Sequence, residues 1–164
     1  MRPARFAVLL CAALSACASP PPEPSFGDPA GWVREDARGL FSFLRPPALA
    51  PREVVGFDSY VGEYRGEGAV LRFDYGAYSD PLRDYGQRGY ARRAVSVSGR
   101  DAVLARYRLS EDEEGRTWFA GLHVPRVEPT ASGAIRRLTL WATCRTEAAC
   151  DELETALLSV TLPG

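Results

Sequence analysis

Residues 135–144 read IRRLTLWATC, and residues 145–158 directly after them read RTEAACDELETALL. In the first stretch alternate side chains are apolar from Leu138 onward, which is the pattern of a strand with one buried face. The second stretch offers Thr146 as a helix cap and carries an apolar stripe at helical spacing. That stripe consists of Cys150, Leu153, Ala156 and Leu157. A strand followed by such a helix predicts a sheet packed by a C-terminal helix.

Upstream of this pair, six further stretches have the composition or the alternation of strands. They are residues 39–44, 54–64, 69–75, 94–98, 102–109 and 117–124. Gly66 and Gly68 connect two of them and favour a hairpin. Residues 81–85 follow Asp80, a good cap, and could form a short helix. We therefore predict an α+β fold, with a mostly antiparallel sheet of about six or seven strands packed by the C-terminal helix and one or two short helices.

The N-terminal residues have the pattern of an export signal. Arg2 and Arg5 precede an apolar run at residues 6–14, which is too short to span a bilayer permanently. The run ends in Leu14, Ser15, Ala16 and Cys17. This order resembles the lipobox of bacterial lipoprotein signal peptides, and the resemblance covers residues 1–17. It implies cleavage after residue 16 and a diacylglyceryl thioether on Cys17. The new amino terminus of such proteins is usually acylated as well, and palmitate is the acyl group that we expect. The alternatives are an ordinary secretory signal cleaved after Ala16 or Ala18, or a buried apolar helix.

The same resemblance sets the expected domain organisation and location. Residues 1–16 are the signal peptide, residues 17–31 are the lipidated cysteine and a tether with prolines at five positions, and residues 32–164 are a single α+β domain. Proline restricts the backbone to extended conformations, so the tether is expected to be a stiff spacer. Ala18, in place of Asp, resembles the sorting pattern for the periplasmic face of the outer membrane. We expect a lipid-anchored protein of the bacterial cell envelope.

If the signal is removed and Cys17 carries lipid, two of the four cysteines remain as thiols. In an oxidising compartment Cys144 and Cys150 are then expected to form a disulfide. That bridge would hold the C-terminal helix over the face of Leu138 and Leu140. A metal site built on the two cysteines is the alternative, but the single histidine, His123, cannot complete a zinc shell.

A second resemblance covers roughly residues 39–160. A Phe-rich strand before Pro46 and Pro47, two hairpins and a C-terminal helix ending in LLSVTL occur in the order typical of the PsbP-like superfamily. The resemblance implies an α/β/α sandwich. It does not imply an activity, because one fold serves many functions.

The composition excludes several classes of function. All 20 basic residues are arginine, so lysine chemistry is excluded, and after loss of the signal 18 basic residues face 21 acidic ones. This balance does not favour nucleic-acid binding, which needs a basic face. No motif for a metal or a cofactor is present, and we expect neither.

The candidate binding surface lies in two segments rich in tyrosine and aspartate, which the first hairpin would pair. Its residues are Asp58, Tyr60, Tyr75, Tyr78 and Asp80. Tyrosine offers an apolar body with a polar tip, which suits protein or glycan surfaces. The alternative is that the tyrosines pack in the sheet and the aspartates cap turns.

Other candidate sites are weaker. Carboxylates near Asp58, Asp74 or Asp80 could form the acid pair of a hydrolase. Ser98 lacks the glycine that a nucleophile elbow places two residues before its serine. His123 is expected to be a partly exposed sheet residue. The pairs Arg92–Arg93 and Arg136–Arg137 could bind anionic headgroups, but one member of each must point away from the other, and solvated strand edges are the better explanation of both pairs.

The sequence therefore favours a membrane-tethered envelope lipoprotein that acts through surface contacts, as a binding or assembly module and not as an enzyme. Its expected partners are the membrane, through the lipid, and an envelope protein or glycan. The alternative is a cell-envelope hydrolase with paired carboxylates.

Overall fold

The computed structural model describes residues 25–127 and 135–163. The expected signal peptide and the lipidation site, Cys17, lie outside the described residues. None of the helices in the described ranges is long and apolar enough to cross a membrane.

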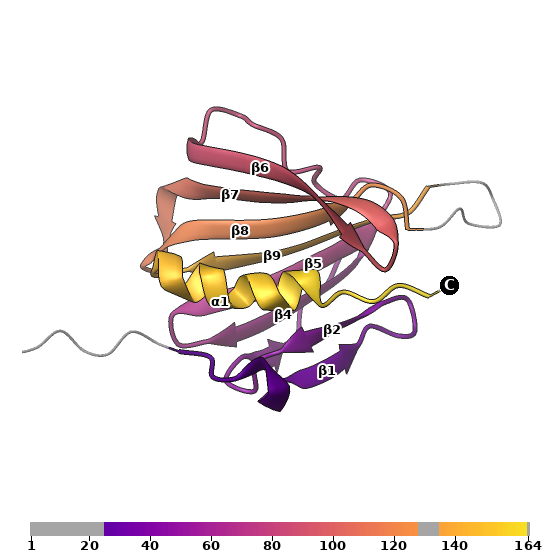
Figure 1. Cartoon of the computed structure of the whole chain (residues 1–164), viewed down its shortest axis with the longest axis horizontal. Helices are drawn as coiled ribbons and strands as arrows, with labels where there is room; N and C mark the ends of the chain where they lie inside the picture. The colour runs from indigo at the N-terminus through magenta and orange to yellow at the C-terminus, as the bar shows by residue number, and fades with distance from the viewer. Residues whose placement is uncertain (1–24, 128–134, 164) are drawn as a thin grey trace, which may run out of the picture.

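The main element is an antiparallel sheet of seven strands, with the strand order β3-β4-β5-β9-β8-β7-β6 (Figure 1). The strands are β3 (Ala50–Arg52), β4 (Tyr60–Gly66), β5 (Ala69–Gly76), β6 (Arg88–Val97), β7 (Arg100–Glu113), β8 (Arg116–Val124) and β9 (Arg137–Cys144). A separate hairpin pairs β1 (Val33–Asp36) with β2 (Ser42–Arg45). The α+β prediction is confirmed, and the alternating stretch at residues 135–144 contains a central strand of this sheet, β9.

Helix α1 (Glu147–Leu158) packs on β8 and β9 and covers one face of the sheet (Figure 1). Thr146 caps it, because its side chain accepts a hydrogen bond from the N–H of Ala149 at 3.2 Å. The disulfide between Cys144 and Cys150 is present, with 5.6 Å between the Cα atoms. It ties the end of β9 to the first turn of the helix, as the sequence predicts. The buried stripe of α1 contains Ala149, Cys150, Leu153, Ala156 and Leu157.

The N-terminal segment closes the same side of the molecule. The range expected to be a tether ends at residue 31, yet Phe26 is only 6% exposed and belongs to the main core. Its N–H donates to Glu152 of α1 at 2.7 Å, and its carbonyl accepts from the indole of Trp32 at 3.0 Å. A short 3-10 turn, η1 (Pro29–Gly31), lies between these contacts. Residues 25–31 therefore contact the domain, because an aromatic side chain within the proline-rich range is buried.

Two sequence predictions of local structure are wrong. Residues 81–85 form no helix: Asp80 caps a turn by accepting from the N–H of Leu82 at 2.8 Å, and Leu82 has a positive φ of 53°. The strand expected to begin at residue 54 begins at Tyr60, after a loop at residues 53–59. In that loop a Cβ atom on Gly56 would lie 2.2 Å from the carbonyl oxygen of Ser59, so the chain folds back on itself too tightly for a regular strand.

The second face of the sheet has no helix among the described residues, although the α/β/α resemblance implies one. Part of this face is covered by the connection between β5 and β6, whose Leu82 packs with Ala105 and Phe119. Leu82 would be 2.9 Å from a Cβ atom on Gly121, so this glycine allows the loop to lie close to the sheet.

The start of the domain can be tested by comparing residues 25–164 with residues 32–164. We expect the shorter chain to lose roughly 3 kcal/mol of its free energy of unfolding, because it lacks the buried Phe26 ring. Urea unfolding of both chains measures this difference. Phe26→Ala in the longer chain should reproduce most of the loss, and Ser25→Ala, at an exposed neighbour, should not. Equal stability of the two chains would show that the domain begins at residue 32.

Candidate functional site

A hollow of about 620 Å³ lies at the end of the β4–β5 hairpin that is remote from its turn. It takes residues from the β1–β2 turn, from the loop at 53–59, from both strands and from the segment before β9. The lining residues are Leu40, Phe57, Asp58, Ser59, Tyr60, Tyr75 and Arg136. Its size falls in the range usual for small ligand sites, although it is open to solvent.

The walls of the hollow are held by aromatic packing. Tyr60 and Tyr75 are direct partners across β4 and β5. The ring of Tyr75 stacks on Phe41 with 6.0 Å between centroids, and Tyr60 meets the ring of Phe73 edge-on at 5.1 Å. The guanidinium of Arg38 lies 4.5 Å from the ring centre of Tyr60. These contacts fix both tyrosines before any ligand arrives, which lowers the entropic cost of binding.

The loop at residues 53–59 forms an apolar ridge beside this hollow. Val55 is 91% exposed and Phe57 is fully exposed, at 105%. A second hollow, of about 570 Å³, lies on the other side of the ridge, and Ser59 and Tyr60 line both. Apolar side chains displayed together beside a concave surface are typical of interaction sites.

The five residues of the predicted binding surface are therefore divided by the fold. Asp58, Tyr60 and Tyr75 meet in the hollow. Tyr78 is 83% exposed in the β5–β6 connection, and Asp80 caps the turn at Leu82; neither lines the hollow. The alternative reading, in which tyrosines pack and aspartates cap turns, holds for Tyr75 and for Asp80.

Of the residues that the structure describes, Asp58 alone brings a carboxylate to the hollow. Asp74 faces the opposite side of the sheet, because it alternates with the core residues Phe73 and Tyr75. One carboxylate oxygen of Asp74 is buried without a hydrogen-bond partner in the described structure. No group of three or more His, Cys, Asp or Glu that could hold a metal occurs in residues 25–127 and 135–163.

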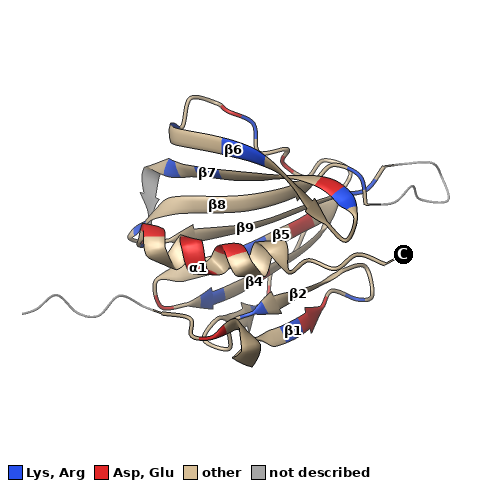
Figure 2. Ribbon diagram, viewed as in Figure 1, with Lys and Arg blue, Asp and Glu red and all other residues tan. Residues whose placement is uncertain are grey.

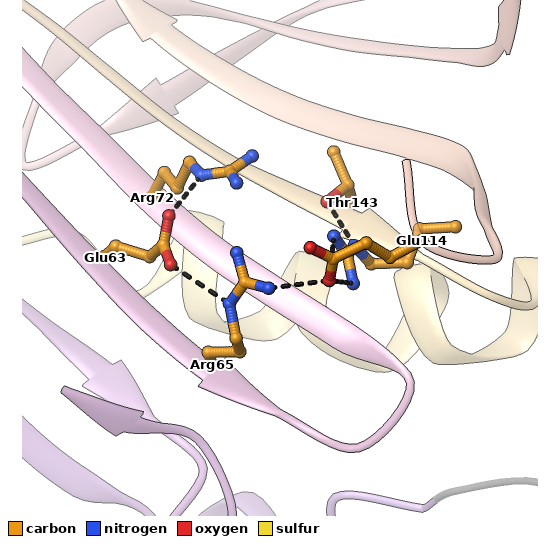
Figure 3. A network of polar contacts seen from close by, with 6 residues as sticks. Glu63, Arg65, Arg72, Glu114 and Thr143 are labelled. Atoms are coloured by element: carbon orange, nitrogen blue, oxygen red, sulfur yellow. Dashed lines mark hydrogen bonds and ion pairs between the residues drawn. The ribbon is translucent and has the colours of Figure 1, made fainter. Parts of the chain in front are cut away.

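A network of charged residues crosses the second face of the sheet (Figure 3). Glu63 accepts from Arg65 at 3.1 Å and from Arg72 at 2.8 Å, and Arg65 continues to Glu114 at 2.6 Å. Arg116 contacts Glu114 and donates to Thr143, each at 3.2 Å. Burial opposes the ionisation of Glu63, but the hydrogen bonds and charges of Arg72 and Arg65 hold its pKa below the ordinary value. The carboxylates are thus engaged with arginines, so the network stabilises the sheet and offers no free acid for catalysis.

His123 lies on the same face, and the prediction that it is partly exposed is wrong. It is 4% exposed. Its neighbours Leu122 and Val124 face the main core, so His123 points to the second face, and there the β5–β6 connection covers it. Its Nδ1 lies 2.9 Å from the Thr139 hydroxyl, which donates its proton to the Asp80 carbonyl at 2.7 Å. Nδ1 is therefore the donor. Burial, reinforced by the charge of Arg137, lowers the pKa of His123 to about 4, although Asp80 acts in the opposite direction.

The two arginine pairs are split between the faces, as their alternation predicts. Arg93 forms an ion pair with Glu154 on α1, whereas Arg92 lies on the second face, across from Ala105. Arg137 donates to the carbonyl of Ala77, while Arg136 lines the hollow.

The sequence prediction missed the most exposed part of the site. The strand propensity of Val54, Val55 and Phe57 predicts a strand and gives no sign that these side chains are displayed on a loop. Gly56, in the middle of an apolar run, was the available signal of a bend.

His123 should make the protein sensitive to acid. Its folded pKa of about 4 lies below the value of 6.5 expected for the unfolded chain, so the unfolded chain takes up the proton first as the pH falls. The stability due to neutral His123 is complete above pH 6.5 and is lost towards pH 4. Between about pH 7.5 and about pH 5, wild type should lose about 2 kcal/mol more unfolding free energy than His123→Gln. Urea titrations at both values measure this; parallel losses in the two proteins would contradict it.

Comparison with known proteins shows what this arrangement resembles. No family model matches the chain, and no curated protein matches it in sequence. Its structure is similar to the solution structure of cyanobacterial PsbP (CyanoP) from Synechocystis sp. PCC 6803, with a TM-score of 0.52 and 17% identity. The match covers 92% of this chain and 99% of that one. At this identity the likeness concerns the fold alone, and the fold is PsbP-like.

Proposed function

We propose that the protein is a lipid-anchored lipoprotein of the bacterial cell envelope that acts as a binding or assembly module through the ridge at residues 53–59 and the hollow beside it. The observation that carries this proposal is the exposure of Val55 (91%) and Phe57 (105%) on one short loop between two hollows, of which Val55 lines one and Phe57 the other. Monomeric proteins seldom display large apolar side chains side by side unless a partner covers them.

The chemistry of the hollow fits an extended peptide or a glycan of an envelope partner. Tyr60, which is half-buried, offers part of a flat apolar ring and a hydroxyl group, and aromatic anchors of this kind contribute much of the binding energy. Tyr75 is 6% exposed and closes the hollow from behind. Arg136 and Asp58 add one donor group and one acceptor group at the rim. A hydrolase with two carboxylates finds less support, because among the described residues the hollow is lined by one carboxylate, that of Asp58.

Membrane attachment is tested by changing Cys17. Acyl chains contribute about 0.8 kcal/mol per buried methylene, and two or three chains make attachment effectively stable. Cys17→Ser should therefore move the protein from the membrane fraction to the soluble fraction of the cells that produce it. Cys11→Ser, within the expected signal peptide, should leave fractionation unchanged. If both variants remain with the membrane, lipid on Cys17 is not the anchor.

The binding surface is tested by placing a photo-crosslinking amino acid at Phe57 in the lipidated protein. We expect one reproducible adduct with an envelope component, because Phe57 is the most exposed apolar side chain of the ridge. The matched control is the same probe at Tyr85, which is 69% exposed but lies in the β5–β6 connection, and it should give no such adduct. Equal adducts at both positions would contradict the assignment of the surface.

The same surface predicts a separation of binding from stability. Phe57→Ser should abolish the adduct formed by a probe at Val55, yet change the free energy of unfolding by less than about 0.5 kcal/mol, since the ring has no packing to lose. Urea unfolding measures the second quantity. A large loss of stability would show that Phe57 supports the fold and is not a binding residue.

A further inference from the structure

We propose a second interaction surface, the outer edge of strand β6, which accepts one extended segment of a partner protein with alternating acidic and apolar residues. The segment would pair with β6 as an eighth strand of the sheet. This surface goes beyond the hollow and does not depend on the lipid anchor.

The two edges of the sheet differ in how open they are. Strand β3 is three residues long and contains Pro51, which has no N–H to offer, so that edge is protected. Strand β6 is ten residues long and contains no proline. It has a register shift between Arg88 and Ala91, after which residues 91–97 pair regularly with β7. No described strand pairs with the outer side of β6, so a regular row of backbone groups is available there.

The charge of this edge is of one sign. Strand β6 carries Arg88, Arg92 and Arg93 and no acidic residue (Figure 2). Arg93 is neutralised by Glu154 of α1, but Arg88 and Arg92 have no acidic partner within ion-pair distance in the described structure. A second copy of β6 would bring arginines against arginines, and like charges on paired strands are destabilising. The charge therefore disfavours self-pairing and favours an acidic strand.

On the face of the sheet that α1 covers, the edge at β6 favours an apolar residue of the partner strand. A small, largely apolar dimple of about 100 Å³ is lined by Ala91, Arg92, Arg93, Leu104 and Arg106. Arg93 and Arg106 have their charges paired with Glu154 and Asp151 of the helix, so their aliphatic stems form its walls. One branched aliphatic side chain fills such a space.

These two requirements together define the partner. Arg92 and Arg93 lie on opposite faces of the sheet, because neighbouring residues of a strand alternate. An added strand would place acidic side chains on the face of Arg92 and apolar side chains on the face of the dimple. Addition of a strand to an open sheet edge is a known mode of peptide recognition, in which the backbone supplies affinity and alternate side chains supply specificity.

The test uses the full-length mature protein in mild detergent and a fluorescent seven-residue peptide of alternating valine and glutamate. Binding is followed by fluorescence anisotropy. The peptide of alternating valine and arginine serves as the probe of opposite charge. We expect the acidic peptide to bind and the basic peptide not to bind. Arg92→Glu should weaken the acidic peptide by about tenfold and allow the basic peptide to bind.

Arg52→Glu is the matched control, because it makes the same charge change at an exposed position of the opposite edge strand. It should leave the binding of the acidic peptide within about twofold of wild type. Thermal unfolding of both variants checks that the fold is intact. Hydrogen exchange should slow at the amides of residues 91–97 when the acidic peptide binds. Absence of binding at millimolar peptide, equal effects of the two variants, or unchanged exchange in β6 would each overturn the proposal.

Discussion

Helix α1 buries Leu153 and Leu157 completely against the middle of the seven-stranded sheet, where Leu138, Leu140 and Leu122 are equally inaccessible. The disulfide between Cys144 and Cys150 and the cap at Thr146 fix where this helix begins, directly after the central strand. Because one twelve-residue helix cannot cover seven strands, the β1–β2 hairpin and the segment around Phe26 complete the same layer. The core beneath this layer contains most of the buried apolar side chains of the described residues, so the other face of the sheet has to be closed by different means.

On that second face, a network of charged residues and the β5–β6 connection take the place of a layer of helices. The Glu63, Arg65, Arg72 and Glu114 network pairs its charges internally, and Leu82 covers the small residues Ala105 and Gly121. His123 is held neutral beneath this loop through Thr139 and Asp80. Polar groups that satisfy one another have little free energy to gain from a ligand. One buried carboxylate oxygen of Asp74 is an exception on this face. The groups that a partner could reach lie at the end of the sheet and along its open edge.

The alternation of apolar residues in strands and their helical spacing in α1 predicted the elements that pack around the main core. Strands β5, β7, β8 and β9, the helix and the disulfide were all foreseen, since each depends on a local pattern facing one layer. His123 was misplaced because an alternating pattern does not reveal that a loop distant in sequence covers the polar face of the strand. Of the five candidate surface residues, Tyr60 and Tyr75 are brought together by the predicted pairing of β4 with β5, whereas Tyr78 and Asp80 belong to a connection whose course no local signal determines. The burial of Phe26 was not predicted either, because the prolines around it are typical of an extended tether.

The most informative disagreement concerns residues 54–57. Valine and phenylalanine in such a run favour a buried strand, and the fold instead displays them on a loop that bends at Gly56. Burial of a valine or phenylalanine side chain stabilises a protein by about 1.5–3 kcal/mol, and the exposed side chains of this loop do not contribute that free energy. A free protein gains nothing from that arrangement, whereas a protein with a partner recovers the loss when the ridge is covered. Conflicts between local propensity and the adopted fold are expected at functional sites, where selection acts on the complex as well as on the isolated chain. The ridge beside the tyrosine-walled hollow is such a conflict. The ten-residue length of β6 is a second departure from the usual rule, since edge strands are normally short or blocked as β3 is, whereas β6 is guarded by its arginines and by the register shift between Arg88 and Ala91. Both features are costly for an isolated domain and useful for one that works in contact with other molecules.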